Sequence, residues 1–199
     1  MLLDAFGLRS KKSTLIYSHF YLLSRRSITT GGVQGVKPTD FLSTARELLN
    51  AGRNRPRQTN LRRACSTAYY ALFHALCSSC ASALTSKATR RAWIHVYRSV
   101  EHGIAKNSCT NKEVMRHFPD EIKDFANMFV QMHEKRHRAD YDPDEKFLKS
   151  AVSNDIDAVE SVIEAFKNTP LRHRRAFAAH VLLKPLPNDR KPRKGQNRP

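Results

Sequence analysis

Glycine is scarce in this chain beyond its first 36 residues. Of its seven glycines, only Gly52, Gly103 and Gly195 lie after residue 36. Alternating runs of β-branched residues closed by a hairpin turn are also lacking, whereas apolar residues recur at the three- and four-residue spacing of helices. The missing strand signals argue against the classes of fold that contain a sheet, and they predict an all-α protein.

Long hydrophobic runs are equally lacking. The longest one near the N-terminus, "LIYSHFYLL" at residues 15–23, is interrupted by Ser18 and His19. A bilayer requires ~20 consecutive apolar residues, so we expect no membrane-spanning segment and a cytoplasmic protein. Because residues 1–30 are basic, Ser-rich and almost free of acids, an organelle transit peptide is the alternative for that segment.

Cysteine is infrequent as well, with four residues among 199. This density does not suit a disulfide framework in a chain of this length. Cys77 and Cys80 form a C-x-x-C, but they lie within an uninterrupted helical pattern and have no second pair. Their position predicts core packing rather than metal binding or redox chemistry.

Acidic residues are few at the two ends of the chain. The formal net charge is +17, and residues 1–36 and 171–199 together hold fourteen Lys and Arg against two Asp. Such segments attract phosphate polymers or anionic surfaces, although they also occur as solubilising extensions. We predict a basic N-terminal extension outside the fold at residues 1–36, a folded unit at 37–170, and a flexible basic C-terminal tail at 171–199.

The folded unit should consist of helices. The predicted spans are Thr39, as N-cap, to Gly52; residues 56 or 59 to 84; 90–104; 120, as N-cap, to 141; and 146–168, with a short basic amphipathic helix over 171–183. The second helix is apolar over most of its circumference. Its two stripes are Leu61, Ala64, Ala68, Leu72, Ala75 and Leu76, and Tyr69, Phe73, Cys77, Cys80 and Leu84. Such a helix must be central, so we predict an up-and-down bundle of four or five helices.

A polar face interrupts this central helix at spacings of four, three and four residues. Its members are Arg63, Thr67, Tyr70 and His74. Unpaired polar groups are costly when buried, by roughly 1–3 kcal/mol, so this face needs partners. Arg136 and Asp140 are the natural ones, because Arg136 continues the apolar stripe of Phe129 and Met132 and so points toward the core or a partner chain.

The segment "HEKRH", residues 133–137, matches H-E-x-x-H literally. In zinc peptidases this motif needs a third ligand and usually a strand edge that holds the substrate. Neither is visible here, and no Gly-rich phosphate loop or G-x-S-x-G occurs. We therefore predict no metal site and no cofactor.

Two stretches, "LRRACSTAYYALFHAL" at residues 61–76 and "RHRADYDP" at residues 136–143, together resemble the HEPN family, the higher-eukaryote and prokaryote nucleotide-binding domain. The resemblance is to a prokaryotic branch with an A-Y-Y-A-x-F-H helix and an R-x-x-A-D-Y motif, and it covers about residues 38–168. It implies an all-α bundle of four or five helices, a homodimer and a role around RNA. Many members are metal-independent ribonucleases of toxin–antitoxin, phage-defence or RNA-processing systems, and others accompany a minimal nucleotidyltransferase.

Nuclease members of the family carry an arginine followed, four to six residues later, by a histidine. Arg136 matches the arginine, whereas Tyr141 stands where the histidine is expected. An imidazole titrates near neutral pH and can move the proton of a 2′-hydroxyl, while a phenol with a pKa of about 10 is a poor base. His74 or His137 is the candidate substitute, and whether the protein is an enzyme stays open.

These considerations define a predicted site. The candidate catalytic residues are Arg136, Asp140, His74 and His137. The candidate RNA- or nucleotide-binding residues are Arg63, Tyr70, Arg136, Arg138 and Tyr141. The expected function is a HEPN-like module that binds RNA or nucleotide as an accessory or toxin component of a toxin–antitoxin or defence system, with a nucleotidyltransferase antitoxin as partner. The alternatives are a dimeric, metal-independent endoribonuclease and a structural protein-interaction bundle.

Overall fold

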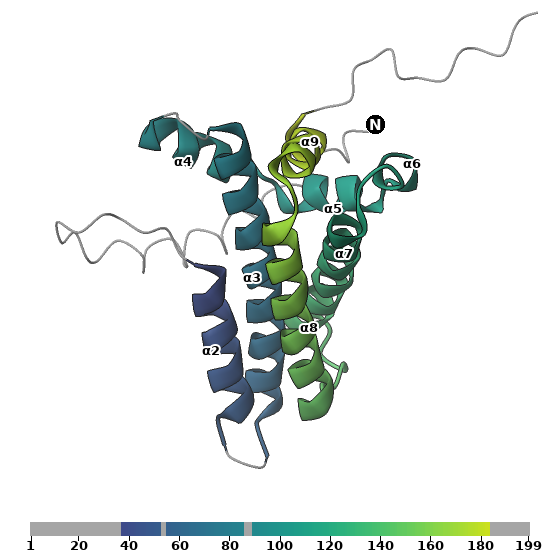
Figure 1. Ribbon diagram of the computed structural model, residues 1–199. Coiled ribbons are helices and arrows are strands. Elements are labelled where there is room, and N and C mark those ends of the chain that lie inside the picture. Colours follow the sequence, from purple (N-terminus) through teal and green to yellow (C-terminus); the bar gives the residue numbers. More distant parts are fainter. Residues whose placement is uncertain (1–36, 53–54, 86–88, 184–199) are drawn as a thin grey trace, which may run out of the picture. The chain divides into compact units, whose positions relative to one another are not determined.

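The computed structural model describes residues 37–52, 55–85 and 89–183, and within these ranges the protein is entirely helical (Figure 1). Eight α-helices and no strand occur among the described residues, which confirms the predicted all-α class there. None of these helices combines the length and the apolarity that crossing a membrane requires. The predicted N-terminal extension at residues 1–36 and the end of the predicted C-terminal tail, residues 184–199, lie outside the described residues.

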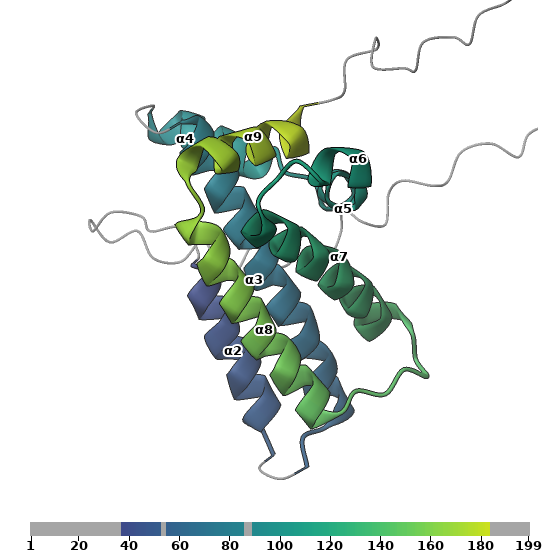
Figure 2. The same cartoon turned by 45° about the vertical axis from the view of Figure 1, so that its right-hand side comes forward.

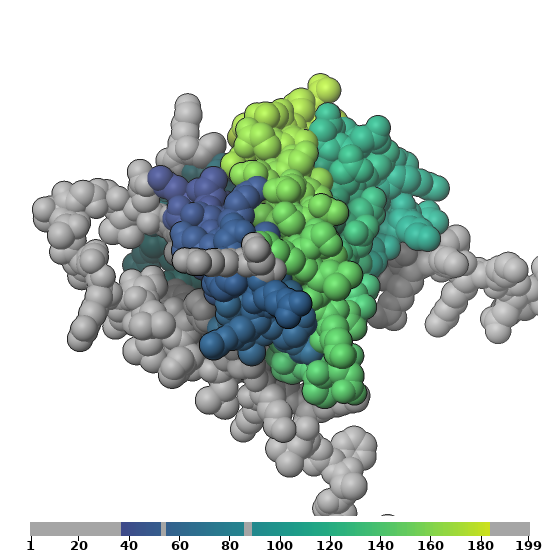
Figure 3. Space-filling model, turned by 90° about the horizontal axis from the view of Figure 1, so that it is seen from below, coloured from purple at the N-terminus to yellow at the C-terminus, as the bar shows by residue number. Residues whose placement is uncertain are grey.

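Helix α3 (Gln58–Leu84) is the central element. It contacts five other helices: α2 (Pro38–Asn50), α4 (Arg90–Arg98), α7 (Asp120–Tyr141), α8 (Lys149–Asn168) and α9 (Leu171–Leu182). Helix α8 also contacts α2 and α7, so α2, α8 and α7 pack around α3 on successive sides (Figures 1 and 2). Seen from below, the surfaces of α2, α3 and α8 adjoin (Figure 3). The predicted central position of the second helix is thus observed.

Close packing around α3 follows from its residue sizes. Several buried positions are alanine, including Ala64, Ala68 and Ala71, and these let neighbouring helices approach. Large side chains then fill the space between the other helices, as in the stacked rings of Phe125 and Phe166, whose centroids are 4.1 Å apart. All four cysteines are free and buried, which confirms the prediction of core packing for Cys77 and Cys80.

Helix α2 begins two residues earlier than predicted. Lys37 is the N-cap and Pro38 the first helical residue, so Thr39 is not the cap. Proline suits the first helical position because the N–H that it lacks would have no intrahelical acceptor there. At the other end, Gly52 adopts a positive φ of 94°, a conformation that glycine reaches without strain, and this agrees with the predicted stop.

The predicted single helix over residues 90–104 is wrong. The chain forms α4 and then α5 (His102–Thr110), followed by the short α6 (Lys112–Met115). The break falls at Glu101, whose backbone is extended, while Val100 is buried. Val100 follows Val96 and Tyr97 at helical spacing, so the pattern of the sequence did not reveal this break.

Two leucines within the predicted helices are exposed. Leu84, at the end of α3, is 46% exposed. Leu148, predicted within the last core helix, is its N-cap and is 68% exposed, whereas the neighbouring Phe147 is buried outside the helix.

The predicted boundary at residue 170 is too early. Residues 171–182 form α9, which contacts α3 and α5. Phe177, Ala178 and Val181 of this helix are buried in the common core, and Arg175 donates from Nε to the carbonyl oxygen of Ala83 at 3.0 Å. The amphipathic pattern of this segment therefore serves packing, and the folded unit extends to residue 182 at least.

Candidate functional site

The first half of α3 lies against the end of α7 through four polar side chains spaced four residues apart. These are Gln58, Arg62, Ser66 and Tyr70, which we call the polar stripe of α3. Residues at this spacing share one helix face. Gln58 contacts the backbone of Phe147, and Arg62 contacts the carbonyl oxygen of Ala139. Further along α3, Ser66 contacts the carboxylate of Asp140, and Tyr70 contacts the guanidinium of Arg136. The two helices therefore run antiparallel along this contact.

Arg136 lies at the centre of the predicted site. Its Nε is 2.8 Å from Oδ2 of Asp140, and the two side chains are 19% and 20% exposed. The buried Nε–H does not point along this contact, so the pair is an ion pair rather than an aligned hydrogen bond. Nη2 donates to the Tyr70 hydroxyl at 3.4 Å, and the guanidinium carbon is 5.9 Å from the ring centroids of both Tyr70 and Tyr141. We call Tyr70, Arg136, Asp140 and Tyr141 the Arg136 cluster.

Neighbouring side chains hold the charged groups of Arg136 and Asp140 in place. The Ser66 hydroxyl donates to Oδ1 of Asp140 at 2.7 Å. Burial lowers the pKa of Arg136, but the Tyr70 hydroxyl and the Asp140 carboxylate outweigh it and raise that pKa above its ordinary value. Arg136 is therefore a permanent cation with a fixed orientation.

Tyr141 gives the cluster an exposed aromatic surface. The residue is 54% exposed, and among the described residues it is the one aromatic residue in the group of exposed large hydrophobic side chains. The ring of His137 lies against it, with centroids 4.9 Å apart. Of the predicted residues, the structure thus brings Tyr70, Arg136, Asp140 and Tyr141 together and places His137 at their edge.

His74 is not part of the cluster. Its Nδ1 hydrogen-bonds to the Tyr97 hydroxyl of α4, and its ring stacks on Phe41 of α2 with centroids 4.6 Å apart. Burial lowers the pKa of His74 to about 4. At neutral pH this imidazole is uncharged, and its hydrogen bond and stacking serve the packing of α2 and α4 against α3.

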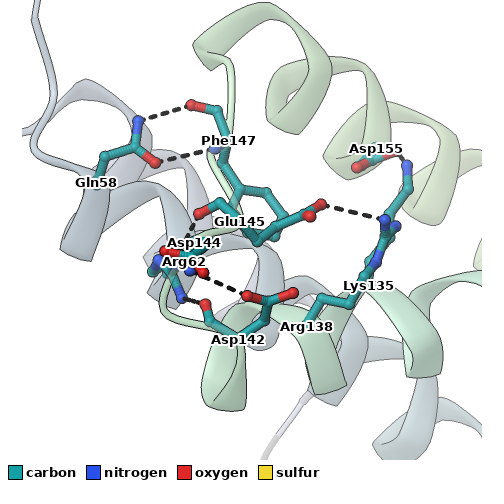
Figure 4. A network of polar contacts seen from close by, with 9 residues as sticks. All are labelled: Gln58, Arg62, Lys135, Arg138, Asp142, Asp144, Glu145, Phe147 and Asp155. Atoms are coloured by element: carbon teal, nitrogen blue, oxygen red, sulfur yellow. Dashed lines mark hydrogen bonds and ion pairs between the residues drawn. The ribbon is translucent and has the colours of Figure 1, made fainter.

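Two other predicted RNA-binding residues, Arg63 and Arg138, are not members of the Arg136 cluster. Arg63 lies on an exposed part of α3, and Thr67 donates its hydroxyl to the carbonyl oxygen of Arg63 at 2.6 Å within the helix. Arg138 pairs with Glu145 at 3.1 Å, in the segment that follows α7 (Figure 4). Arg138 therefore belongs to the network that holds this segment.

Arg62 dominates that network, and the sequence analysis did not single it out. Its Nη1 donates to the carbonyl oxygens of Ala139 at 3.1 Å and Asp142 at 2.6 Å. Its Nη2 donates to those of Pro143 at 3.1 Å and Glu145 at 2.5 Å. The only sequence signal was its place four residues before Ser66, on a face that appears only once the rotation of α3 about its axis is known.

Gln58 holds the far end of the same segment. Its side-chain amide donates to the carbonyl oxygen of Phe147 and accepts from the Phe147 N–H, both at 2.9 Å (Figure 4). Outside this pairing, Lys135 of α7 contacts Asp155 of α8 at 2.5 Å. The segment from residue 142 to residue 147 is thus tied to α3 along its length.

His102 is a further residue that the sequence analysis missed. It is the first residue of α5, its Nδ1 hydrogen-bonds to the Tyr69 hydroxyl, and its ring stacks on Phe73 with centroids 3.6 Å apart. Burial, with smaller contributions from Arg136 and His133, lowers the pKa of His102 to about 3. His102 lies at the start of α5 because the predicted helix over residues 90–104 is in fact divided between two helices.

The members of the "HEKRH" segment have separate partners. Glu134 pairs with Lys106 at 3.2 Å, His133 lies edge-on to Tyr69, and His137 lies against Tyr141. Within the described ranges, no group of three or more His, Cys, Asp or Glu side chains is placed to hold a metal ion.

Comparisons of the chain with protein-family models, with curated proteins and with solved structures found no match.

Proposed function

We propose that this protein is a HEPN-type module that binds RNA or a nucleotide at the Arg136 cluster, with Arg136 contacting a phosphate and Tyr141 stacking on a base. The observation that supports the proposal best is that the Arg136 guanidinium carbon lies 5.9 Å from the centroids of two phenol rings, one of which belongs to an exposed residue. A guanidinium matches the geometry of a phosphate, and unpaired bases stack on exposed aromatic rings.

The contacts of Arg136 leave one of its nitrogens for such a ligand. Within the part of the chain that the structure describes, its polar contacts use Nε and Nη2. Nη1 remains for an incoming phosphate oxygen, while Asp140 keeps the guanidinium plane oriented. This arrangement differs from an ion pair on a helix surface, which contributes only ~0.3–0.5 kcal/mol.

The biological setting that we propose follows from the resemblance of the two motifs. It is an accessory or toxin component of a toxin–antitoxin or defence system, located in the cytoplasm. The partners would be a second copy of the chain in a bundle dimer and a nucleotidyltransferase antitoxin. The all-α fold of the described residues and the meeting of the two motifs across α3 and α7 are consistent with this setting.

A metal-independent endoribonuclease is the second candidate, and the placement of His137 beside Tyr141 favours it. In such an enzyme Arg136 would hold the scissile phosphate and His137 would move the proton of the 2′-hydroxyl. His74 suits this role less well, because it is held by Tyr97 and Phe41 and its pKa is lowered to about 4 by burial.

Binding of a labelled single-stranded RNA to the full chain in EDTA, followed by fluorescence anisotropy at two salt concentrations, tests the proposal. Tyr141→Ala should weaken binding about 5- to 150-fold, the equivalent of ~1–3 kcal/mol for one stacked base, and should leave folding intact because the ring is exposed. Arg136→Lys should weaken binding as well, since an ammonium cannot form the planar contacts. Arg116→Gln is the matched control, because Arg116 is an exposed cation at the end of α6 that pairs with Glu113.

Equal binding by wild type, Tyr141→Ala and Arg136→Lys would refute the proposal and assign any RNA affinity to the basic ends of the chain. The same samples, analysed for cleaved RNA, decide on the second candidate. Cleavage that persists in His74→Ala and disappears in His137→Ala would support a ribonuclease, and cleavage that persists in both would rule out this assignment.

A further inference from the structure

We propose that Arg62 is a positioning residue for the Arg136 cluster: it holds the last turn of α7 so that Asp140 and Tyr141 flank the guanidinium of Arg136. The inference rests on the proposed function and names the residue that prepares its site. Arg62 does not touch the expected ligand. Its role follows from the four backbone carbonyls that its side chain contacts.

The end of a helix leaves its last carbonyl oxygens without intrahelical donors and with partial negative charge. In α7 this end carries Asp140 and Tyr141. Arg62 contacts the carbonyls of Ala139 and Asp142, which bracket these two residues in the chain. The backbone on either side of Asp140 and Tyr141 is therefore fixed by one planar side chain with a rigid fork of donors.

The register of the polar stripe links this clamp to the site. Arg62, Ser66 and Tyr70 follow one another on one face of α3, and they meet the backbone, the carboxylate and the guanidinium of the α7 end in turn. A shift of the last turn of α7 would move Asp140 away from Ser66 and Tyr141 away from Arg136. The contacts that Asp140 makes with Ser66 and Tyr141 makes with Arg136 thus depend on the contact of Arg62 with the backbone.

The segment after α7 strengthens the clamp. Arg62 also contacts the carbonyls of Pro143 and Glu145, and its guanidinium carbon is 6.0 Å from the ring centroid of Phe147. Gln58 pairs in both directions with the backbone of Phe147. Two side chains of α3, one turn apart, therefore hold a six-residue connection, residues 142–147, that has no regular secondary structure of its own.

The test compares Arg62→Lys and Arg62→Gln with wild type in the full chain. Lysine keeps the positive charge but lacks the fork, so a purely electrostatic role would be retained in Arg62→Lys and a positioning role would be lost in both variants. Arg46→Gln is the matched control, because Arg46 also ties two helices, through Asp157 and Glu160 of α8, but lies away from the site.

Two readouts are required, and both are taken at a temperature where each variant is folded. Hydrogen exchange followed by mass spectrometry should show at least tenfold faster exchange in peptides covering residues 139–148 in both Arg62 variants, with residues 120–132 unchanged. RNA binding should weaken at least tenfold in both variants and by less than twofold in Arg46→Gln. Gln58→Ala removes only the contacts with the backbone of Phe147. It should accelerate exchange near residues 145–148 and have a smaller effect on RNA binding. This variant replaces the Arg62 variants in the test if those fail to fold.

Wild-type exchange rates in Arg62→Lys would overturn the proposal, and so would faster exchange with unchanged RNA binding. Failure of the wild type itself to bind RNA or nucleotide would overturn the proposed function, and with it the role of Arg62 in binding. Because exchange is measured without ligand, these two failures are distinguishable.

Discussion

The two sides of α3 hold the helix in different ways. On the apolar side, Leu61, Leu72 and Leu76 are at most 3% exposed and pack against several helices at once. Along the neighbouring polar stripe, Gln58 and Arg62 each contact particular backbone atoms of the α7 end and of the segment after it. Apolar contacts depend on area and volume, whereas hydrogen bonds depend on direction. The comparison indicates that the apolar side provides stability, and that the polar stripe sets the geometry of the Arg136 cluster.

The apolar side should respond most strongly to substitution. Phe129 is fully buried, with its ring centroid 5.5 Å from that of Tyr69. Phe129→Ala should lower the free energy of unfolding by about 3–5 kcal/mol, because it removes apolar burial and leaves a cavity. Urea unfolding at pH 7 measures the change. Leu148→Ala, at a site 68% exposed, is the control and should cost less than about 0.5 kcal/mol. A loss below about 1 kcal/mol in Phe129→Ala would contradict the assignment of stability to this side.

Acid should destabilise the helical core through two partly buried histidines that pack against α3, His74 and His102. Burial lowers the pKa of His74 to about 4 and that of His102 to about 3, against about 6.5 in an unfolded chain. Above pH 6.5 both states are neutral and stability is complete, and below it the unfolded state alone takes up the protons. Between pH 6.5 and 4 the free energy of unfolding should therefore fall, by on the order of 3 kcal/mol for each histidine.

Unfolding curves at a series of pH values test this dependence. His102→Asn, which keeps an acceptor for the Tyr69 hydroxyl, should remove the share of His102. His95→Asn is the matched control, because His95 is exposed. An identical slope in wild type and His102→Asn would show that His102 is not the group that titrates.

The polar stripe should show a smaller effect on stability and a larger one on geometry. Ser66→Ala removes the hydroxyl that donates to Asp140 at 2.7 Å and leaves a partly buried carboxylate oxygen without that donor. We expect a loss of about 1–3 kcal/mol in the free energy of unfolding. Ser43→Ala, whose exposed hydroxyl donates to Glu47 at 3.4 Å, is the control and should change stability by less than about 0.5 kcal/mol. Equal losses in the two variants would remove the distinction between the stripe and the surface.

The smallest expected effect is the coupling between Arg136 and Asp140. A double-mutant cycle to alanine should give a coupling of about 1 kcal/mol, since both side chains are mostly buried. The pair of Lys123 and Asp120, at the start of the same helix, is the control, because its side chains are 37% and 88% exposed. There we expect only about 0.2–0.5 kcal/mol. Equal couplings would imply that the Arg136 pair is an ordinary surface pair.

Much of the helical framework could be predicted from the sequence. The spans of α3, α7 and α8 agree with the predictions within a few residues, because long apolar stripes at helical spacing and the proline after α7 are local signals. The meeting of Tyr70 with Arg136 was also foreseeable, because Tyr70 belongs to a polar face that needs partners and Arg136 continues the apolar stripe of Phe129 and Met132. The break before His102 was not, because Val100 continues the helical spacing of Val96 and Tyr97 and so gives no local sign that the helix ends.

The sequence by itself determined that the described chain is helical, that α3 is central, and that Arg136 lies in register with Phe129 and Met132. Only the tertiary structure decided that Arg62 meets the end of α7, and that His74 turns toward α4. Neighbouring residues of a helix point about 100° apart, and which of them faces a given neighbour depends on how α3 rotates about its own axis. That rotation is set by the packing of all the surrounding helices together, which no local pattern encodes.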